Sequence, residues 1–208
     1  MFNKKREEEG IKITLLGNPG VGKTCIISRY IDNIFIENND STIGANYSEK
    51  TIKRGDKEVQ LNIWDTAGQE KFHSLGKHFY KDSYVVCLVY DITNQDSFNS
   101  LQNKWIKDVK NYGEKYNILA VVGNKLDLFE KKQVTEDEGE KFAHGINAIF
   151  MLTSAKTGDG IEKLFNTLTD KFLSPEFNPK VKEMIRKRGP SFSVDNEKND
   201  KNFQKKCC

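Results

Sequence analysis

Long hydrophobic runs are missing from this sequence of 208 residues. No segment approaches the roughly 18 consecutive apolar residues that a bilayer-spanning helix needs, although hydrophobic residues make up 37% of the chain. The first residues, MFNKKREEE, also lack the apolar stretch of a secretory signal. We therefore expect a water-soluble body that stays in the reducing cytosol and folds without disulfides.

Cysteine is scarce, with four residues in the chain. Cys25 and Cys87 fall in segments that we expect to lie in the core, where small buried thiols are the simplest interpretation. Cys207 and Cys208 end the chain side by side. Such a pair is an idle chain end, part of a metal site or an acceptor for lipid. Metal binding needs more ligands than two neighbours supply, and no histidine lies nearby.

A charge excess of either sign is missing from most of the chain. From Ser174 onward there are nine Lys and Arg and five Asp and Glu residues, which leaves 24 basic and 25 acidic residues before that point. A nearly neutral body argues against nucleic-acid binding, and a basic tail suits an anionic membrane surface. Three of the four prolines also follow Leu173. We predict an N-terminal extension (1–10), one domain (11–173) and a flexible basic tail (174–208).

Apolar runs alternate with helical patterns throughout the predicted domain. Strands are expected at 11–17, 58–65, 84–91, 117–124 and 148–154, and helices at 23–34, 96–112, 136–144 and 160–172. Gly55 and Asp56 separate two alternating segments, which indicates an antiparallel hairpin at one edge. This order predicts an α/β fold: a mostly parallel six-stranded sheet with one antiparallel edge strand and helices on both faces. Ligands of such sheets bind at the carboxyl ends of the strands.

The segment after the first expected strand is GNPGVGKT, residues 17–24, which fits the phosphate-binding pattern G-x-x-x-x-G-K-[ST]. Its glycines, Gly17 and Gly22, let the backbone curl so that N–H groups face phosphate oxygens. Lys23 would neutralise phosphate charge, and Thr24 would bind Mg²⁺. The alternative is a glycine-rich turn that binds nothing. A strand before the segment and a helix after it favour the phosphate site.

Three further segments with polar residues follow later expected strands. In DTAGQE, Asp65 stands where a carboxylate facing Mg²⁺ belongs. Gly68 can offer its amide to a γ-phosphate, and Gln69 can position a water molecule. The segments NKLD (124–127) and SAK (154–156) each follow an apolar run. By itself NKLD is equally well an ordinary solvated turn, but its place after a strand favours a ligand site.

These segments, in this order, resemble the Ras superfamily of small GTPases over about residues 11–173. The resemblance implies a P-loop small G domain that binds GTP or GDP with Mg²⁺ and hydrolyses GTP. It implies that Asp127 accepts hydrogen bonds from guanine, so that adenine is rejected. The implied metal ligands are Thr24, Thr42 and, through water, Asp65. The implied nucleotide-binding residues are Gly20, Val21, Gly22, Lys23, Thr24, Cys25, Phe35, Thr42, Gly68, Asn124, Lys125, Asp127, Ser154, Ala155 and Lys156.

The resemblance also assigns roles around the base and in two switch loops. Asn124 would brace the base loop, Lys125 would cover the guanine ring, and Ala155 would offer its amide to guanine O6. Loss of the γ-phosphate would release two loops, residues 36–46 and 68–79, and so change the surface that partners contact.

Hydrolysis, by the same resemblance, proceeds by attack of a water molecule that Gln69 orients, while Lys23 and Thr42 help to stabilise the transferred phosphoryl group. We find no arginine in position to act as an internal finger, so a GTPase-activating protein (GAP) should be needed for fast turnover.

Pro19 departs from the family pattern, because Ras has glycine at this position. Its ring fixes φ and removes an N–H group close to the reacting phosphate. A GTP-held recruiting module with impaired hydrolysis is therefore an alternative to a hydrolysing switch. A P-loop nucleotide kinase or ATPase is a third possibility, but the short chain and the segment 124–127 disfavour it.

Several segments resemble the Rab branch of the superfamily, among them STIG (41–44) and LVYDIT (88–93). Tyr47, Trp64 and Phe79 match the aromatic triad that Rab proteins present to effectors. The alternative is that Trp64 and Phe79 are merely core aromatics.

The Rab resemblance also concerns the chain end and the partners. Rab proteins that end in two cysteines carry geranylgeranyl groups on both, and the pattern C-a-a-X is absent here. The implied partners are an exchange factor, a GAP, a GDP-dissociation inhibitor, the prenylation machinery, effectors and a membrane surface. The segments KFHSLGKHFYKDS and WIKDVK favour early endocytic traffic. We therefore expect cycling between cytosol and the cytoplasmic face of an intracellular membrane, with an endosomal membrane as the finer expectation.

Overall fold

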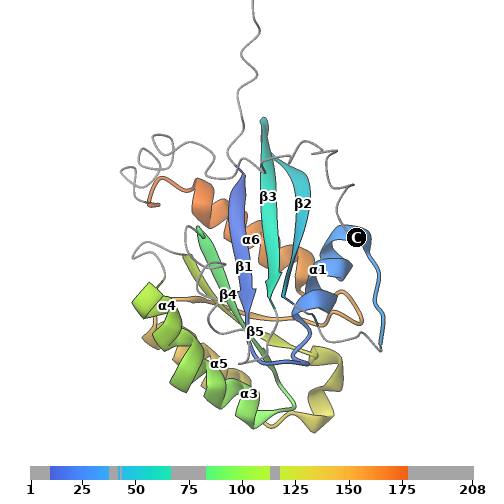
Figure 1. The fold of residues 1–208 in the computed structure, drawn as a ribbon, viewed down its shortest axis with the longest axis vertical. Coiled ribbons are helices and arrows are strands. Elements are labelled where there is room, and N and C mark those ends of the chain that lie inside the picture. The colour runs from blue at the N-terminus through green and yellow to red at the C-terminus, as the bar shows by residue number, and fades with distance from the viewer. Residues whose placement is uncertain (1–9, 38–41, 43, 67–82, 113–117, 178–208) are drawn as a thin grey trace, which may run out of the picture.

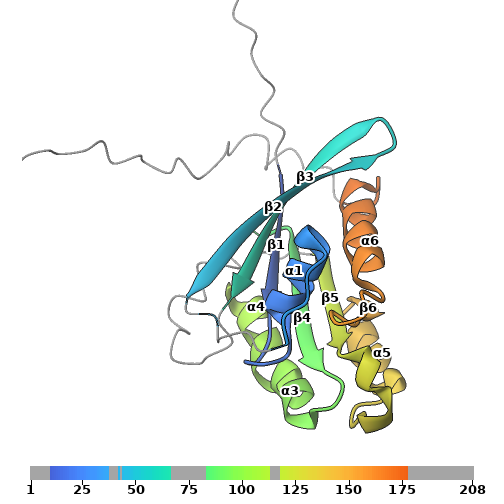
Figure 2. The same ribbon diagram turned by 90° about the vertical axis from the view of Figure 1, so that its right-hand side faces the viewer.

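The computed structural model describes residues 10–37, 42, 44–66, 83–112 and 118–177. These residues form one sheet covered by helices on both faces (Figures 1 and 2). The strands are β1 (Ile11–Leu16), β2 (Ala45–Arg54), β3 (Lys57–Thr66), β4 (Val85–Asp91), β5 (Ile118–Asn124) and β6 (Ile149–Leu152). The helical elements are α1 (Lys23–Asp32), α3 (Gln95–Ser100), the π-helical turn η2 (Leu101–Trp105), α4 (Ile106–Tyr112), the 3-10 helix η3 (Leu126–Lys131), α5 (Glu136–Gly145) and α6 (Ile161–Leu173).

The order of the strands is β2-β3-β1-β4-β5-β6. Every neighbouring pair is parallel except β2 and β3, which are joined by the tight turn at Gly55, where φ is +58°. The predicted six-stranded, mostly parallel sheet with one antiparallel edge strand is therefore confirmed. The carboxyl ends of β1, β3, β4, β5 and β6 meet at one edge, where ligands of such sheets bind.

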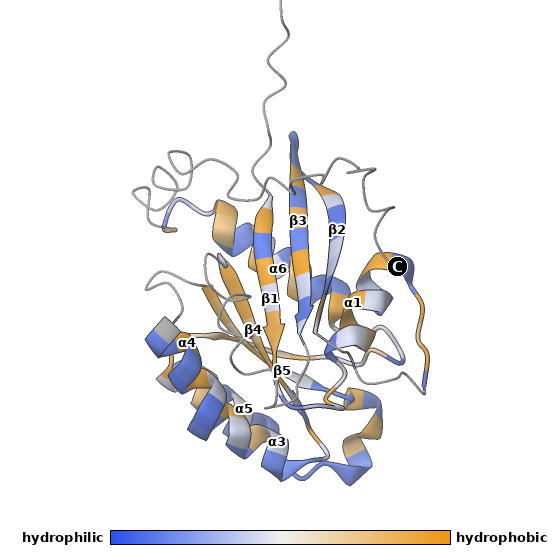
Figure 3. Cartoon of the chain, viewed as in Figure 1, coloured by the Kyte–Doolittle hydropathy of each residue, from blue (hydrophilic) through white to orange (hydrophobic). Residues whose placement is uncertain are grey.

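Two hydrophobic cores hold the layers together. One lies between the sheet and the pair α1 and α6, and the other lies between the sheet and the elements α3, η2, α4 and α5. The central strand β4 is buried along its whole length and appears as one of the most apolar strands in Figure 3. Burial on both faces explains why its sequence, VVCLVYD, is a continuous apolar run rather than an alternating one.

Some expected boundaries were wrong. Ala45 and Asn46 were expected in a loop, but they belong to β2 because they pair with Thr66 and Asp65 of β3. The single helix expected at 96–112 is interrupted by the π-helical turn η2, and the short helix η3 was not expected. Cys87 is buried as predicted, whereas Cys25 is only partly buried.

The described part of the chain ends shortly after α6. Phe177 is buried, and its ring centroid lies 5.1 Å from that of Phe172. The domain boundary near residue 173 remains a prediction. Among the described residues, no helix is long and apolar enough to cross a membrane. Gly68, Gln69, Phe79, Cys207 and Cys208 lie outside the described residues.

Candidate functional site

The phosphate-loop segment lies between β1 and α1. Gly22 adopts a left-handed conformation with φ of +94°, and a Cβ atom there would lie 2.4 Å from Asn124 Nδ2. Both the backbone conformation and the lack of space therefore require glycine at this position. Among the described residues no side chain caps the N-terminus of α1. Its first N–H groups, with the positive end of the helix dipole, form an anion-binding end.

Lys23 places a buried ammonium group at this end of α1. Its side chain is 6% exposed, and Nζ donates hydrogen bonds to Gly17 O at 2.8 Å and to Asn18 O at 3.0 Å. Burial lowers the pKa of Lys23 from 10.5 to about 8, and the Asp65 carboxylate opposes part of this shift. An ammonium group whose charge is so poorly compensated is suited to an anionic ligand such as phosphate.

Three oxygen-bearing side chains meet beside the loop. Thr24 Oγ1 donates to Asp65 Oδ2 at 2.7 Å, and Thr42 Oγ1 donates to the same oxygen at 3.2 Å. The second carboxylate oxygen, Oδ1, is buried and has no hydrogen-bond partner among the described residues. Burial raises the pKa of Asp65, and the bonds from the two threonines oppose that shift. One carboxylate with two hydroxyls fits Mg²⁺, which prefers oxygen ligands and retains water and phosphate in its coordination shell.

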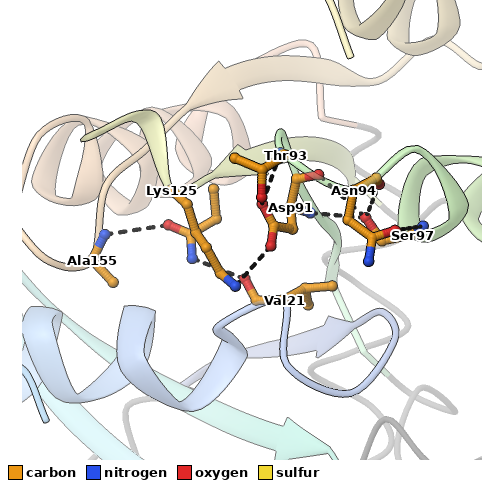
Figure 4. A network of polar contacts seen from close by, with 8 residues as sticks. Val21, Asp91, Thr93, Asn94, Ser97, Lys125 and Ala155 are labelled. Carbon is orange, nitrogen blue, oxygen red and sulfur yellow. Dashed lines mark hydrogen bonds and ion pairs between the residues drawn. The ribbon is translucent and has the colours of Figure 1, made fainter. Parts of the chain in front are cut away.

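Asn124 connects the phosphate loop to the base-binding segments. Its Nδ2 donates to Val21 O at 2.9 Å, and its Oδ1 accepts from Thr153 Oγ1 and from the Ala155 amide, each at 3.2 Å. In Figure 4, Val21 and Ala155 lie on opposite sides of the polar network, and dashed lines mark the hydrogen bonds that they form with it. The Ala155 amide, expected to face guanine O6, therefore already has one acceptor.

Two polar contacts orient the remaining base-loop side chains. Ser154 Oγ donates to Asp127 Oδ1 at 2.5 Å. Lys125 Nζ forms an ion pair of 2.7 Å with Asp91 Oδ2 at the end of β4, as Figure 4 shows. Both contacts hold side chains around the base loop in place, and such preorganisation lowers the entropic cost of binding.

A cavity of about 360 Å³ joins the phosphate end to the base end. Three of the described residues expected at the site are buried and do not line this cavity: Val21, Asp65 and Ser154. The residues expected at the nucleotide that line this cavity are Gly20, Gly22, Lys23, Thr24, Cys25, Phe35, Thr42, Asn124, Lys125, Asp127, Ala155 and Lys156.

Arg29 was missed by sequence reasoning, although it holds the base loop from α1. Its Nε donates to Ala155 O at 2.8 Å and its Nη2 donates to Lys156 O at 2.8 Å. It lies 126 residues from Ala155 in the sequence, so no local pattern reveals the contact. Asp91 was also missed, but its place at a strand end was an available signal.

Replacing Arg29 with alanine is expected to speed GDP dissociation about tenfold, because two charge-assisted hydrogen bonds to the base loop are lost. The measurement is the release of a fluorescent GDP analogue into excess GDP. Arg54→Ala is the matched control: Arg54 pairs with Asp170 at 3.2 Å, far along α6 from the base loop. Equal dissociation rates for the two variants would contradict the role of Arg29.

The aromatic residues expected to face effectors are described in part. Tyr47 is 48% exposed, and its ring centroid lies 5.3 Å from that of Trp64, which is partly buried. The two rings therefore form a joint surface at the β2–β3 edge of the sheet.

A phosphate loop, an oxygen cluster suited to Mg²⁺ and a base loop with an oriented carboxylate, joined by one cavity on a mostly parallel sheet, define a P-loop nucleotide-binding protein with a small G domain. The Ras family model matches residues 12–174. The chain is 37% identical to the Ras-related protein Rab-31 of Homo sapiens, over 95% of this chain and 97% of that protein. It is 39% identical to human Rab-30, over 78% and 80%. It is 43% identical to Rab-21 of Geodia cydonium, over 81% and 72%.

The chain therefore belongs to the Ras family and is a Rab-type small GTPase. It binds GTP and GDP, hydrolyses GTP and acts as a molecular switch that associates with intracellular membranes in vesicle-mediated transport.

Proposed function

We propose that this Rab switch binds Mg²⁺·GTP in the cavity between the phosphate loop and the base loop, with the residue roles given below. The observation that carries the proposal is the arrangement of that one cavity. The buried ammonium group of Lys23 stands at one end. The carboxylate of Asp127, which accepts a hydrogen bond from Ser154, stands at the other end. These two groups match the two ends of a guanine nucleotide.

At the phosphate end, Lys23 binds the β- and γ-phosphate oxygens, and the N-terminus of α1 donates N–H groups to them. Thr24 and Thr42 would hold Mg²⁺ directly, and Asp65 would hold it through water. When bound, Mg²⁺ neutralises charge on the phosphates. Gly68 and Gln69 lie outside the described residues; we propose that Gly68 donates its amide to the γ-phosphate and that Gln69 orients the attacking water.

At the base end, Asp127 accepts hydrogen bonds from the N1–H and N2 amino groups of guanine. Adenine has no donors in this pattern, so it would leave the carboxylate unpaired. The ion pair with Asp91 aims Lys125 so that its alkyl chain can cover the ring. Phe35 and Lys156 line the same cavity and would contact the base or sugar from either side.

The remaining proposals concern partners and location. Cys207 and Cys208 would carry two geranylgeranyl groups, because one lipid chain gives only marginal membrane binding. We propose an early endosomal membrane as the compartment, and an exchange factor, a GAP, a GDP-dissociation inhibitor and effectors as partners. The effectors would contact the surface of Tyr47, Trp64 and Phe79. The proposed domain limits remain 11–173, with an extension before and a tail after.

The test is GTP loading followed by single-turnover hydrolysis. Protein loaded with radiolabelled GTP and Mg²⁺ is challenged with GDP or ATP, and phosphate release is followed for wild type, Gln69→Leu and Pro19→Gly. We expect GDP alone to compete, and release to fall about a hundredfold in Gln69→Leu. Equal competition by ATP would contradict the assignment of guanine as the bound base. A wild-type protein that binds GTP tightly but releases no phosphate would be a GTP-held recruiting module, provided that Pro19→Gly restores phosphate release.

Chelation of Mg²⁺ with EDTA is expected to speed GDP dissociation about a hundredfold, because phosphate charge then loses its counterion. The Thr24→Ala variant, which lacks one proposed Mg²⁺ ligand, should release GDP quickly with or without EDTA. A wild-type rate that does not respond to EDTA would contradict the proposed metal site. Ser83→Ala is the control, because Ser83 lies just before β4, at the opposite end of the strand from the site.

A further inference from the structure

The side chain of Asn18, the second residue of the phosphate-loop segment, contacts the helical layer on one face of the sheet. Asn18 Nδ2 donates to Ser100 Oγ at 2.9 Å, and Trp105 Nε1 donates to Asn18 Oδ1 at 3.0 Å. Both the amide nitrogen and the amide oxygen of Asn18 are thus engaged by residues more than 80 positions away in the sequence. The indole belongs to a side chain that is 6% exposed, so its N–H group depends on this acceptor.

The π-helical turn η2 brings the two partners of Asn18 together. Ser100 and Trp105 are five residues apart, and in a regular α-helix five residues turn the chain so that the two side chains diverge by about 140°. Here the Ile106 N–H bonds to Leu101 O, which widens the turn by one residue. The widened turn places Ser100 and Trp105 close enough together to hold a single amide between them.

The backbone of Asn18 is part of the phosphate end of the cavity. Its carbonyl oxygen accepts the 3.0 Å hydrogen bond from Lys23 Nζ. The following residue, Pro19, cannot donate a hydrogen bond and has a fixed φ, so it does not anchor the loop by its own backbone N–H. The side chain of Asn18 therefore fixes the carbonyl that helps to hold the ammonium group.

We infer that Asn18 is a positioning residue of the nucleotide site: anchored by Ser100 and Trp105, it holds the phosphate loop so that Lys23 stays at the phosphate end of the cavity. The elements α3 and η2 thereby control how long the nucleotide stays bound. The inference rests on the proposed role of Lys23 in binding phosphate.

A double-mutant cycle on GDP dissociation tests this inference. The variants are Asn18→Ala, Trp105→Phe and their combination, each loaded with a fluorescent GDP analogue at fixed Mg²⁺. Trp105→Phe keeps an aromatic ring and removes the N–H donor. We expect Asn18→Ala to speed dissociation about tenfold and Trp105→Phe about fivefold, and the double variant to resemble Asn18→Ala alone, because both remove the same contact. Asn18→Asp keeps the acceptor for Trp105 Nε1 but loses the donor to Ser100 Oγ, so its GDP dissociation rate should lie between those of wild type and Asn18→Ala.

Ser83→Ala is the control for a purely structural effect. It removes a buried side-chain hydrogen bond, Ser83 Oγ to Thr14 Oγ1 at 2.7 Å, and should lower the melting temperature without changing GDP dissociation. Rates that multiply in the double variant, or variants of Asn18 that lose melting temperature but keep the wild-type dissociation rate, would overturn the inference. A Lys23→Met variant that keeps the wild-type affinity for GDP would instead overturn the proposed role of Lys23, so the two failures are distinguishable.

Discussion

Lys23→Met is expected to weaken binding of GTP and GDP by a factor of about 100 to 1,000. The lost interaction is a set of charge-assisted hydrogen bonds from a buried ammonium group to phosphate, worth about 3 to 4 kcal/mol in such a site. Methionine keeps the length and apolar character of the side chain, so the neighbouring core should be little disturbed. Equilibrium titration with a fluorescent GDP analogue gives the affinity directly, and an unchanged dissociation constant would contradict the assignment.

The same substitution should raise the free energy of unfolding of the nucleotide-free protein. The pKa of Lys23 in the folded state, about 8, lies below its ordinary value of 10.5. The buried charge therefore lowers the free energy of unfolding below pH 8, and this cost disappears as the pH rises through 10.5. At pH 7 we expect nucleotide-free Lys23→Met to gain on the order of 2 kcal/mol over wild type, a gain that is absent above pH 10.5. Denaturant unfolding at the two pH values measures this difference. A variant that loses both stability and binding would indicate misfolding instead.

Asp127→Asn is expected to weaken GTP binding by a factor of at least about 100 and to improve binding of xanthosine triphosphate. The carboxylate accepts from two donors of guanine, whereas an amide offers one acceptor and one donor. Xanthine carries a carbonyl oxygen where guanine carries its amino group, so it fits the amide better. Competition between the two nucleotides for the wild type and the variant measures the change in preference.

Asp159→Asn is the matched control for this change of charge. Asp159 accepts from Thr157 Oγ1 at 2.7 Å in the neighbouring loop, but it does not line the cavity. Its variant should keep the wild-type preference for GTP. An Asp127→Asn variant that still prefers GTP as strongly as wild type would show that another group reads the base.

Much of the fold could be predicted because its signals are local. The continuous apolar run at 84–91 indicated the strand β4, and the Gly55–Asp56 turn indicated the antiparallel hairpin. Motifs with fixed spacing, such as residues 17–24 and 124–127, also placed the site at the strand ends. Boundaries were less accurate, since the first residues of β2 become strand only by pairing with the end of β3.

The sequence by itself determined the class of site, because a phosphate loop is a continuous segment whose glycines and helix start dictate its own backbone. It did not determine which side chains support that loop. Arg29 and Asn18 act through partners that are 82 to 127 residues away, and those partners come within reach only when the helices pack on the sheet. No local periodicity indicated the π-helical turn η2 either. The local sequence thus determined which chemical groups form the site of this GTPase, and tertiary packing determined how firmly those groups are held in place.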